Sequence, residues 1–289
     1  MSIIVIVGPT GVGKTKLSIE LAKRVNGEII NADSMQVYKG LDIGTAKVSD
    51  DEKEDIPHHL FDIVDVGEMY TIYDYQRDCR KVLTDIISRG KTPIIVGGSG
   101  LYIRAALFDY KLDFENKKND YSMLSNQELL DRCLSIDKNC NIHINNRKRL
   151  ERFLDINLNN KSIVNDSKPI YDFKMIGLTT DRENLYNIID NRVDKMIKDG
   201  LINEVKSFYD KDIRSKAIMT GIGYKELYSY FDGEISLDDA VDLIKKNSRH
   251  LAKRQYTFFN NQFNNIKWFE VNFKDFSKTI DEVVNYIEG

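Results

Sequence analysis

The sequence predicts an α/β fold in which helices flank a parallel sheet, with a small helical insertion near the middle of the chain. The chain opens with an apolar run, residues 3–7, that leads through a glycine-rich loop into a helical pattern. A second unbroken apolar run, residues 92–96, is typical of a buried parallel strand. A charged and then helical stretch at residues 109–141 predicts the insertion.

The glycine-rich loop reads GPTGVGKT and fits the phosphate-loop pattern G-x-x-x-x-G-K-[ST] in full. Its glycines let backbone N–H groups and the positive end of the next helix converge on an oxyanion. Lys14 adds a charge, and the Thr15 hydroxyl can hold a Mg²⁺ that also touches the phosphate. The alternative is a plain turn of a βα unit. The motif indicates a phosphate-loop NTPase/kinase-like core whose di- or triphosphate ligand would contact Gly8, Pro9, Thr10, Gly11, Val12, Gly13, Lys14 and Thr15.

Composition and length describe a protein with an ample core. The chain has 289 residues, of which 42% are hydrophobic and 30% charged. We expect a core domain at residues 1–108, the insertion at 109–141, and the rest of the core with C-terminal helices at 142–289. The sequence shows neither a leader nor an apolar run of membrane-spanning length, which favours a cytoplasmic protein. The three cysteines are too far apart to indicate a zinc site or disulfide framework, and nothing suggests more than a monomer.

The second predicted strand, residues 28–32, ends at Asp33. Polar residues just beyond the carboxyl end of a strand face the ligand crevice of an open α/β sheet. Asp33 is therefore well placed to touch a reacting group, although it could equally serve as a turn or cap residue. A third strand is predicted at residues 57–63, and the adjacent pair His58 and His59 favours a structural role over metal binding.

The predicted strand at residues 92–96 ends in Gly-Gly-Ser-Gly. Most phosphate-loop hydrolases place an aspartate at this point to hold Mg²⁺. Its absence weakens an ATPase interpretation, although Asp33 or Asp62 could take its place. Further along, a capping box of Thr180 and Glu183 is predicted to open a helix that carries Arg192, a residue that by itself is most simply a surface charge.

Two basic clusters stand out on a chain of net charge −3. Residues 147–152 contain four cations, and a long helical pattern at residues 236–263 places Arg249 and Lys253 four residues apart. Charge runs are often solvated faces. The alternative is a local contact with a polyanion such as nucleic acid.

At this point the motifs GPTGVGKT, ADSMQVYKGLDIGTAK, PHHLFDI, PIIVGGSGLYI, GIGYKEL and LAKRQYTFF, in this order, resemble the tRNA dimethylallyltransferases. The resemblance spans nearly the whole chain. It implies that the loop holds dimethylallyl diphosphate rather than ATP. The implied acceptor is the adenosine directly 3′ of the anticodon, in tRNAs that read codons beginning with U.

The resemblance also implies roles for residues. Asp33 matches the general base, while Thr15 with Mg²⁺, Lys14 and Arg192 would neutralise the leaving diphosphate. The target base must leave its stack to reach a buried carboxylate. The implied contacts to the tRNA anticodon stem-loop are Asp33, Ser34, Met35, Gln36, Ser99, Lys148, Arg149, Leu150, Glu151, Arg152, Arg249, Lys253, Arg254 and Gln255.

Some residues depart from the family pattern. Gly11-Val12 stands where Ala-Ser is common, Ser99 where Thr is common, and Phe258 where Trp is common. The insertion corresponds to a variable helical domain and is short. The zinc finger of eukaryotic members is absent, so a bacterial-type enzyme is expected.

Three other functions remain as alternatives. An adenylate isopentenyltransferase would use the same loop and base on a free nucleotide, but the basic clusters and the insertion argue against it. A phosphate-loop nucleotide kinase would turn over ATP without a prenyl donor. A noncatalytic tRNA-binding module would make Asp33 dispensable and leave the complete phosphate loop without a role.

Overall fold

The computed structural model describes residues 2–110, 119–158 and 165–289. The chain forms two compact units. The core unit comprises Met1–Leu107 and Pro169–Gly289, and the insertion unit comprises Phe108–Lys168. The predicted end of the insertion at residue 141 therefore differs from the structure, in which this unit runs on to Lys168.

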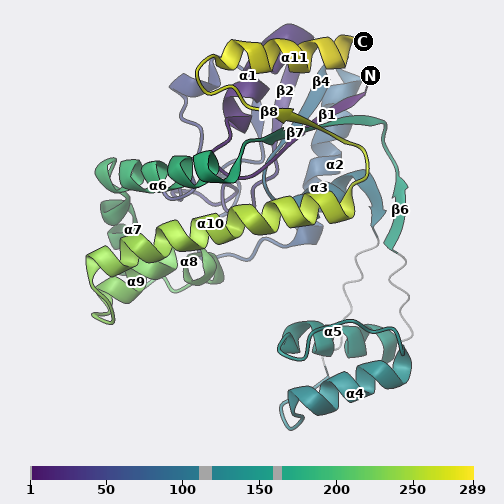
Figure 1. The fold of residues 1–289 in the computed structure, drawn as a ribbon, viewed down its shortest axis with the longest axis vertical. Coiled ribbons are helices and arrows are strands. Elements are labelled where there is room, and N and C mark those ends of the chain that lie inside the picture. Colours follow the sequence, from purple (N-terminus) through teal and green to yellow (C-terminus); the bar gives the residue numbers. More distant parts are fainter. Residues whose placement is uncertain (1, 111–118, 159–164) are drawn as a thin grey trace. The chain divides into compact units, whose positions relative to one another are not determined.

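The core unit is built on a six-stranded sheet with every strand parallel to its neighbours, which agrees with the predicted α/β class (Figure 1). β1 lies in the interior of the sheet, with Val5 opposite Ile95 on one side and Met175 on the other. All five of its residues are buried, as expected of a strand covered on both faces. In spatial order the strands are β3 (His58–His59), β2 (Gly27–Asn31), β4 (Thr92–Val96), β1 (Ile3–Val7), β7 (Phe173–Thr179) and β8 (Ile266–Glu270).

Helices cover both faces of the sheet. The longest, α10, packs against α6 and α9, and α1 packs against α11 (Figure 1). One apolar cluster surrounds β1, and a second lies among the helices and includes Leu201, Tyr224 and Ile244. The helices of this unit are α1 (Lys14–Val25), α2 (Ile72–Ser88), α3 (Gly100–Leu107), α6 (Arg182–Lys198), α7 (Leu201–Tyr209), α8 (Lys216–Thr220), α9 (Tyr224–Phe231), α10 (Leu237–Gln262) and α11 (Phe276–Glu288), with a 3₁₀ turn at Asp51–Lys53.

Two local predictions were wrong. The third strand is limited to His58–His59, because Leu60 (φ 64°) and Asp62 (φ 53°) take left-handed conformations that end an extended run. The cap of α6 is Asp181, whose side chain accepts from the Asn184 N–H, rather than the predicted box of Thr180 and Glu183.

The insertion unit has a small core of its own. α4 (Asn126–Ile136) packs against α5 (Arg147–Leu158) around Leu129, Cys133 and Leu150. The predicted capping box of Ser125 and Glu128 opens α4. Two short strands, β5 (Phe108–Tyr110) and β6 (Asn165–Pro169), pair with each other at the two ends of this unit's sequence. The charged first part of the stretch predicted at residues 109–141 lies largely outside the described residues.

A buried carboxylate supports the edge of the core sheet. Glu28 on β2 is 2% exposed and binds Arg89, Lys91 and His59, at 2.5, 2.7 and 2.8 Å respectively. The hydrogen bond from Arg89 is the largest of the contacts that hold the pKa of Glu28 far below its usual value. His59 thus has the structural role that the sequence favoured.

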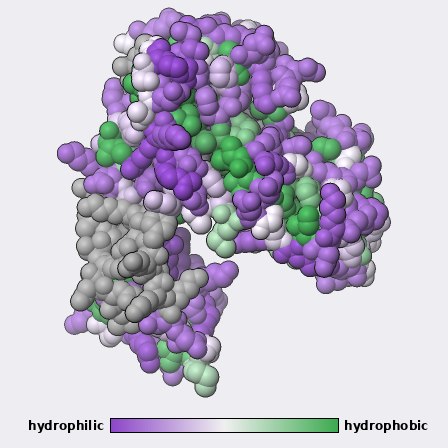
Figure 2. Space-filling model, turned by 180° about the vertical axis from the view of Figure 1, so that it is seen from behind, coloured by the Kyte–Doolittle hydropathy of each residue, from purple (hydrophilic) through white to green (hydrophobic). Residues whose placement is uncertain are grey.

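The surface agrees with the charged composition. The face shown in Figure 2 is mainly hydrophilic, with hydrophobic residues gathered in limited patches. Within the part of the chain that the structure describes, no helix is long and apolar enough to cross a membrane. The thiols of Cys79, Cys133 and Cys140 are free.

Candidate active site

The phosphate loop follows β1 and leads directly into α1. Gly8, Gly11 and Gly13 have φ values of 139°, 90° and 89°, which favour glycine. A Cβ on Gly8 would lie 2.5 Å from the Leu178 carbonyl oxygen, so this turn also needs glycine for space. Val12 is fully buried in the core and anchors the loop rather than facing a ligand. The loop geometry is that of an anion cradle at a helix N-terminus.

Lys14 folds back over this loop. Its Nζ donates to the carbonyl oxygens of Pro9 at 2.7 Å and Gly8 at 3.0 Å. Burial, and then the charge of Arg192, lower the pKa of Lys14 to about 7, while the Asp33 carboxylate opposes the shift. The structure therefore brings Lys14, Arg192 and Asp33 into one electrostatic site.

We expect this lowered pKa to make anion binding depend on pH. A bound pyrophosphate favours charged Lys14, so binding should take up a proton above pH 7, and affinity should fall by up to about tenfold per pH unit above it. Isothermal titration with inorganic pyrophosphate between pH 7 and 9, in buffers of different ionisation heat, measures both effects. The control is Lys14→Arg, whose side chain stays charged over this pH range. Pyrophosphate itself also titrates, but it does so equally with the wild-type protein and with the variant. An identical pH slope in this variant would contradict the assignment to Lys14.

Arg192 reaches the phosphate loop from α6. Its guanidinium donates to Thr10 Oγ1 at 2.9 Å and to the Thr45 carbonyl at 3.4 Å. Burial lowers the pKa of Arg192, and the Asp33 carboxylate partly offsets this. The interpretation of Arg192 as an ordinary surface charge was wrong. A cavity of about 610 Å³ that Arg192 shares with Ile43 and Met196 opens beside this contact.

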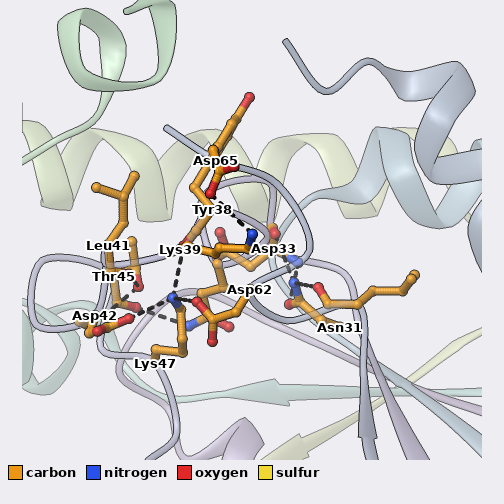
Figure 3. Close-up of polar contacts among 12 residues, drawn as sticks. Asn31, Asp33, Tyr38, Lys39, Leu41, Asp42, Thr45, Lys47, Asp62 and Asp65 are labelled. Atoms are coloured by element: carbon orange, nitrogen blue, oxygen red, sulfur yellow. Dashed lines mark hydrogen bonds and ion pairs between the residues drawn. The ribbon is translucent and has the colours of Figure 1, made fainter. Parts of the chain in front are cut away.

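Asp33 lies in the turn after β2. Its Oδ1 accepts from the Met35 N–H at 2.9 Å, and its own N–H donates to Asn31 Oδ1 at 2.8 Å (Figure 3). Asp33 is thus the turn residue that one interpretation predicted. The same carboxylate acts electrostatically on Lys14 and Arg192, so its position agrees with the other interpretation, while its contact with a reacting group stays a prediction.

The loop at residues 38–47 follows this turn and is held in place by side-chain contacts. The side chain of Lys47 is only 5% exposed, and its Nζ binds Asp42 at 2.6 Å, Asp62 at 2.5 Å and the Tyr38 carbonyl at 2.9 Å (Figure 3). Asp62 is therefore engaged by a cation, which makes it a poor substitute for the missing magnesium-binding aspartate. Gln36 Nε2 donates a hydrogen bond to the Thr45 carbonyl oxygen at 3.0 Å.

Glu204 on α7 holds the same loop from the other side. Its carboxylate accepts from the backbone N–H groups of Asp42, Ile43 and Gly44, at 3.1, 2.7 and 3.1 Å respectively. Tyr224, from the GIGYKEL motif, donates its hydroxyl to the same carboxylate at 2.6 Å. This motif therefore supports the loop whose Thr45 carbonyl contacts Arg192. Sequence reasoning missed Glu204, since a helical glutamate carries no local signal of its partner.

The predicted tRNA contacts separate into several environments. Ser34 follows Asp33 in the turn after β2, and its N–H donates to Ser99 Oγ at 3.0 Å. Met35 is partly buried against the helical cluster. On α10, Arg249 is paired with Asp190 at 2.5 Å, whereas Lys253 and Arg254 are exposed. Gln255 is buried and faces inward.

The insertion unit carries the other predicted contacts. Lys148, Arg149 and Arg152 are exposed on α5, while Glu151 pairs with Arg147 at 2.7 Å. Leu150 is fully buried in the core of this unit and does not reach its surface. The exposed part of the predicted cluster is therefore the three cations.

The protein side chains near the phosphate loop fit a metal ion that is coordinated mainly by phosphate oxygens of a bound ligand. Within the described parts of the chain, no group of three His, Cys, Asp or Glu side chains could hold a metal ion. The exposed hydroxyl of Thr15, at the start of α1, offers one oxygen beside the phosphate loop. Mg²⁺ commonly takes one or two protein oxygens together with phosphate oxygens and water, so these residues fit such an ion.

The parallel sheet, the complete phosphate loop and the Asp33 carboxylate beside it define a phosphate-loop group-transfer enzyme rather than a hydrolase with a strand-end aspartate. The comparisons specify the family. A family model described as IPP transferase matches residues 36–262, and the chain belongs to this family.

Relatives with similar sequences and structures bear names that agree. The tRNA dimethylallyltransferase of Anoxybacillus flavithermus is 46% identical over 300 residues, covering 99% of this chain and 96% of the relative. The crystal structure of the full-length tRNA isopentenylpyrophosphate transferase from Bacillus halodurans has a TM-score of 0.79 and 42% identity, covering 100% of this chain and 96% of that one. The structure of a eukaryotic dimethylallyltransferase described as acting on tRNA has a TM-score of 0.78 and 30% identity. The match covers 93% of this chain and 73% of the eukaryotic one.

Proposed function

We propose that this protein transfers the dimethylallyl group of dimethylallyl diphosphate to tRNA. The acceptor is the exocyclic amine of the adenosine directly 3′ of the anticodon, in tRNAs that read codons beginning with U. The observation that carries the proposal is the convergence of Asp33, Lys14 and Arg192 at the phosphate loop. The names of the relatives support the choice of tRNA as acceptor.

The chemistry needs both a base and a stabilised leaving group. The lone pair of an adenine amine is delocalised into the ring, so the amine must lose a proton as it attacks. Asp33 takes that proton while the new N–C bond forms at the allylic carbon. The C–O bond breaks, and its electrons leave with the diphosphate. Lys14, Arg192 and the loop amides stabilise that charge.

We propose Mg²⁺ as the metal of this reaction, held by Thr15 together with the diphosphate oxygens. Such an ion supplies charge neutralisation at the leaving group. The eight residues of the phosphate loop would bind the donor. Two of them act indirectly, since the Val12 side chain is buried and the Thr10 N–H is already bound to Gln255.

For the acceptor, we propose that the adenine flips out of its stack to reach Asp33. Ser34, Met35, Gln36 and Ser99 surround that turn. Lys253 and Arg254 on α10, and the cations of α5, would contact tRNA phosphates. A tRNA acceptor also implies a cytoplasmic protein. We propose a monomer, which light scattering would report as 33.4 kDa.

The decisive test is mass analysis of nucleosides from unmodified tRNA incubated with the protein, Mg²⁺ and dimethylallyl diphosphate, beside a reaction with ATP alone. A prenylated adenosine formed only with the allylic donor supports the proposal. Prenylated AMP without modified tRNA would instead support an adenylate isopentenyltransferase. Phosphoryl transfer from ATP alone would indicate a kinase.

Neutralising Lys148, Arg149 and Arg152 together should weaken tRNA binding and flatten its salt dependence, because fewer counterions are released from phosphates. For three lost contacts, the slope of log affinity against log salt should decrease by roughly two to three. Filter binding of unmodified tRNA at several salt concentrations measures this. Arg132, Lys138 and Lys168, also exposed in the insertion unit, provide a control that removes the same number of charges. A slope that falls equally in both variants would mean that charge alone, rather than the α5 cluster, affects binding.

A further inference from the structure

Gln255 on α10 is 8% exposed, and its amide contacts two other segments of the core unit. The Thr10 N–H donates to Gln255 Oε1 at 3.1 Å. Gln255 Nε2 donates to the Gly98 carbonyl at 3.3 Å. Both ends of the amide are therefore engaged inside the protein. This arrangement does not suit the tRNA contact that the family resemblance implied for Gln255.

The two contacted segments belong to opposite sides of the reaction. Thr10 is part of the phosphate loop, and its hydroxyl oxygen accepts a hydrogen bond from the Arg192 guanidinium at 2.9 Å. Gly98 immediately precedes Ser99, whose hydroxyl accepts from the Ser34 N–H at 3.0 Å. Ser34 is the neighbour of Asp33 in the turn after β2. Gln255 thus touches the segment that would hold the donor and the segment that fixes the base.

The fit is specific to a side-chain amide. Thr10 offers a donor and Gly98 an acceptor, and an amide provides the complementary acceptor and donor on one planar group. The contact with Gly98 is also close, because a Cβ built on that glycine would lie 2.0 Å from Gln255 Nε2. A carboxylate would keep the contact with Thr10 and lose the one with Gly98. An aliphatic side chain would lose both.

We propose that Gln255 is a positioning residue that fixes the phosphate loop relative to the Asp33 turn. It thereby sets the distance between the diphosphate of the donor and the base that receives the proton of the acceptor. The inference rests on the proposed function for the identity of those two groups. The contacts with Thr10 and Gly98 themselves do not depend on it.

The experiment compares the full-length protein with Gln255→Leu, Gln255→Glu and the control Asn260→Leu, which removes an exposed amide from the same helix. Three quantities are measured: the Kd for inorganic pyrophosphate with Mg²⁺, the Kd for unmodified tRNA, and kcat at saturating substrates. Gln255→Leu should weaken pyrophosphate binding about three- to tenfold, as expected for lost hydrogen bonds. Its kcat should fall at least about tenfold through misalignment, with tRNA affinity unchanged.

Gln255→Glu should retain pyrophosphate affinity better than Gln255→Leu and still lose kcat, because a carboxylate would face the Gly98 carbonyl. Asn260→Leu should match the wild-type protein in all three measurements. Weaker tRNA binding by Gln255→Leu, with normal pyrophosphate affinity and kcat, would overturn the proposal and restore the tRNA contact. If thermal melting shows that Gln255→Leu is unfolded, Gln255→Glu decides: a lower kcat with unchanged tRNA affinity supports the proposal, and an unchanged kcat overturns it.

Failure of the proposed function would be seen separately. A wild-type protein that forms no prenylated nucleoside would disprove the proposed reaction. The pyrophosphate measurement would still test the link between Gln255 and the phosphate loop. Unchanged pyrophosphate affinity in both Gln255 variants would then overturn the positioning role independently of the reaction.

Discussion

Asp33→Asn is expected to lower kcat for tRNA prenylation by at least about a hundredfold, because the amide cannot take the proton of the attacking amine. The asparagine retains a side-chain oxygen for the Met35 N–H, so the turn after β2 should persist. The Kd for unmodified tRNA should stay within about twofold of the wild-type value, since a general base acts mainly in the transition state. Single-turnover rates and tRNA binding, measured on the same preparation, separate the two effects.

A matched control for this variant is Asp65→Asn. Asp65 is exposed and pairs with Lys39 at 3.1 Å, so the control removes one nearby carboxylate charge outside the site. Its kcat should remain at the wild-type level. A loss of tRNA affinity in Asp33→Asn as large as its loss of kcat would contradict the role of general base.

Arg192→Leu is expected to lower kcat/KM by about a hundred- to a thousandfold, the usual effect of removing a preorganised group from developing charge. The variant loses the guanidinium that contacts Thr10 Oγ1 and that, in the proposed reaction, would stabilise the diphosphate. Pyrophosphate should also inhibit the variant more weakly than the wild-type protein. Steady-state kinetics with pyrophosphate as the inhibitor measures both changes.

Arg192→Lys keeps the charge and loses the planar fork that reaches both Thr10 and Thr45, so it should recover only part of the activity. Lys195→Leu is the matched control, because Lys195 is 78% exposed on the same helix and pairs with Asp199. An effect of Lys195→Leu equal to that of Arg192→Leu would mean that net charge on α6, rather than the contact with Thr10, determines the rate.

Local signals made much of the fold predictable, together with the position of the phosphate loop. The strand, loop and helix around Lys14 follow from glycine spacing and apolar periodicity, both of which lie within a few residues. Asp33 was placed at the crevice by its position after a strand. The two interpretations of Asp33 were compatible, because a turn uses one carboxylate oxygen and leaves the charge of the group available to the site.

Contacts between distant parts of the chain were not predictable. Arg192 lies 182 positions from Thr10, and Gln255 lies 245 positions from it. A single arginine or glutamine on a helix looks the same whether it faces solvent or a loop from the other end of the chain. The end of the insertion was missed for a related reason. Leu150 packs against Leu129 and Cys133 in the core of the insertion unit, and an apolar side on a helix does not tell which of two units it packs against.

The junction of the insertion with the core has a consequence for how the family can diversify. The chain leaves the core after Leu107 and re-enters at Pro169, and the Ile170 N–H donates to the Leu107 carbonyl at 2.9 Å. This hydrogen bond holds the points where the chain leaves and re-enters the core unit next to each other. The segment between them can therefore differ in length without shifting the register of β7 against β1. Chains with insertions of different length can thus keep one core unit while the inserted unit evolves separately.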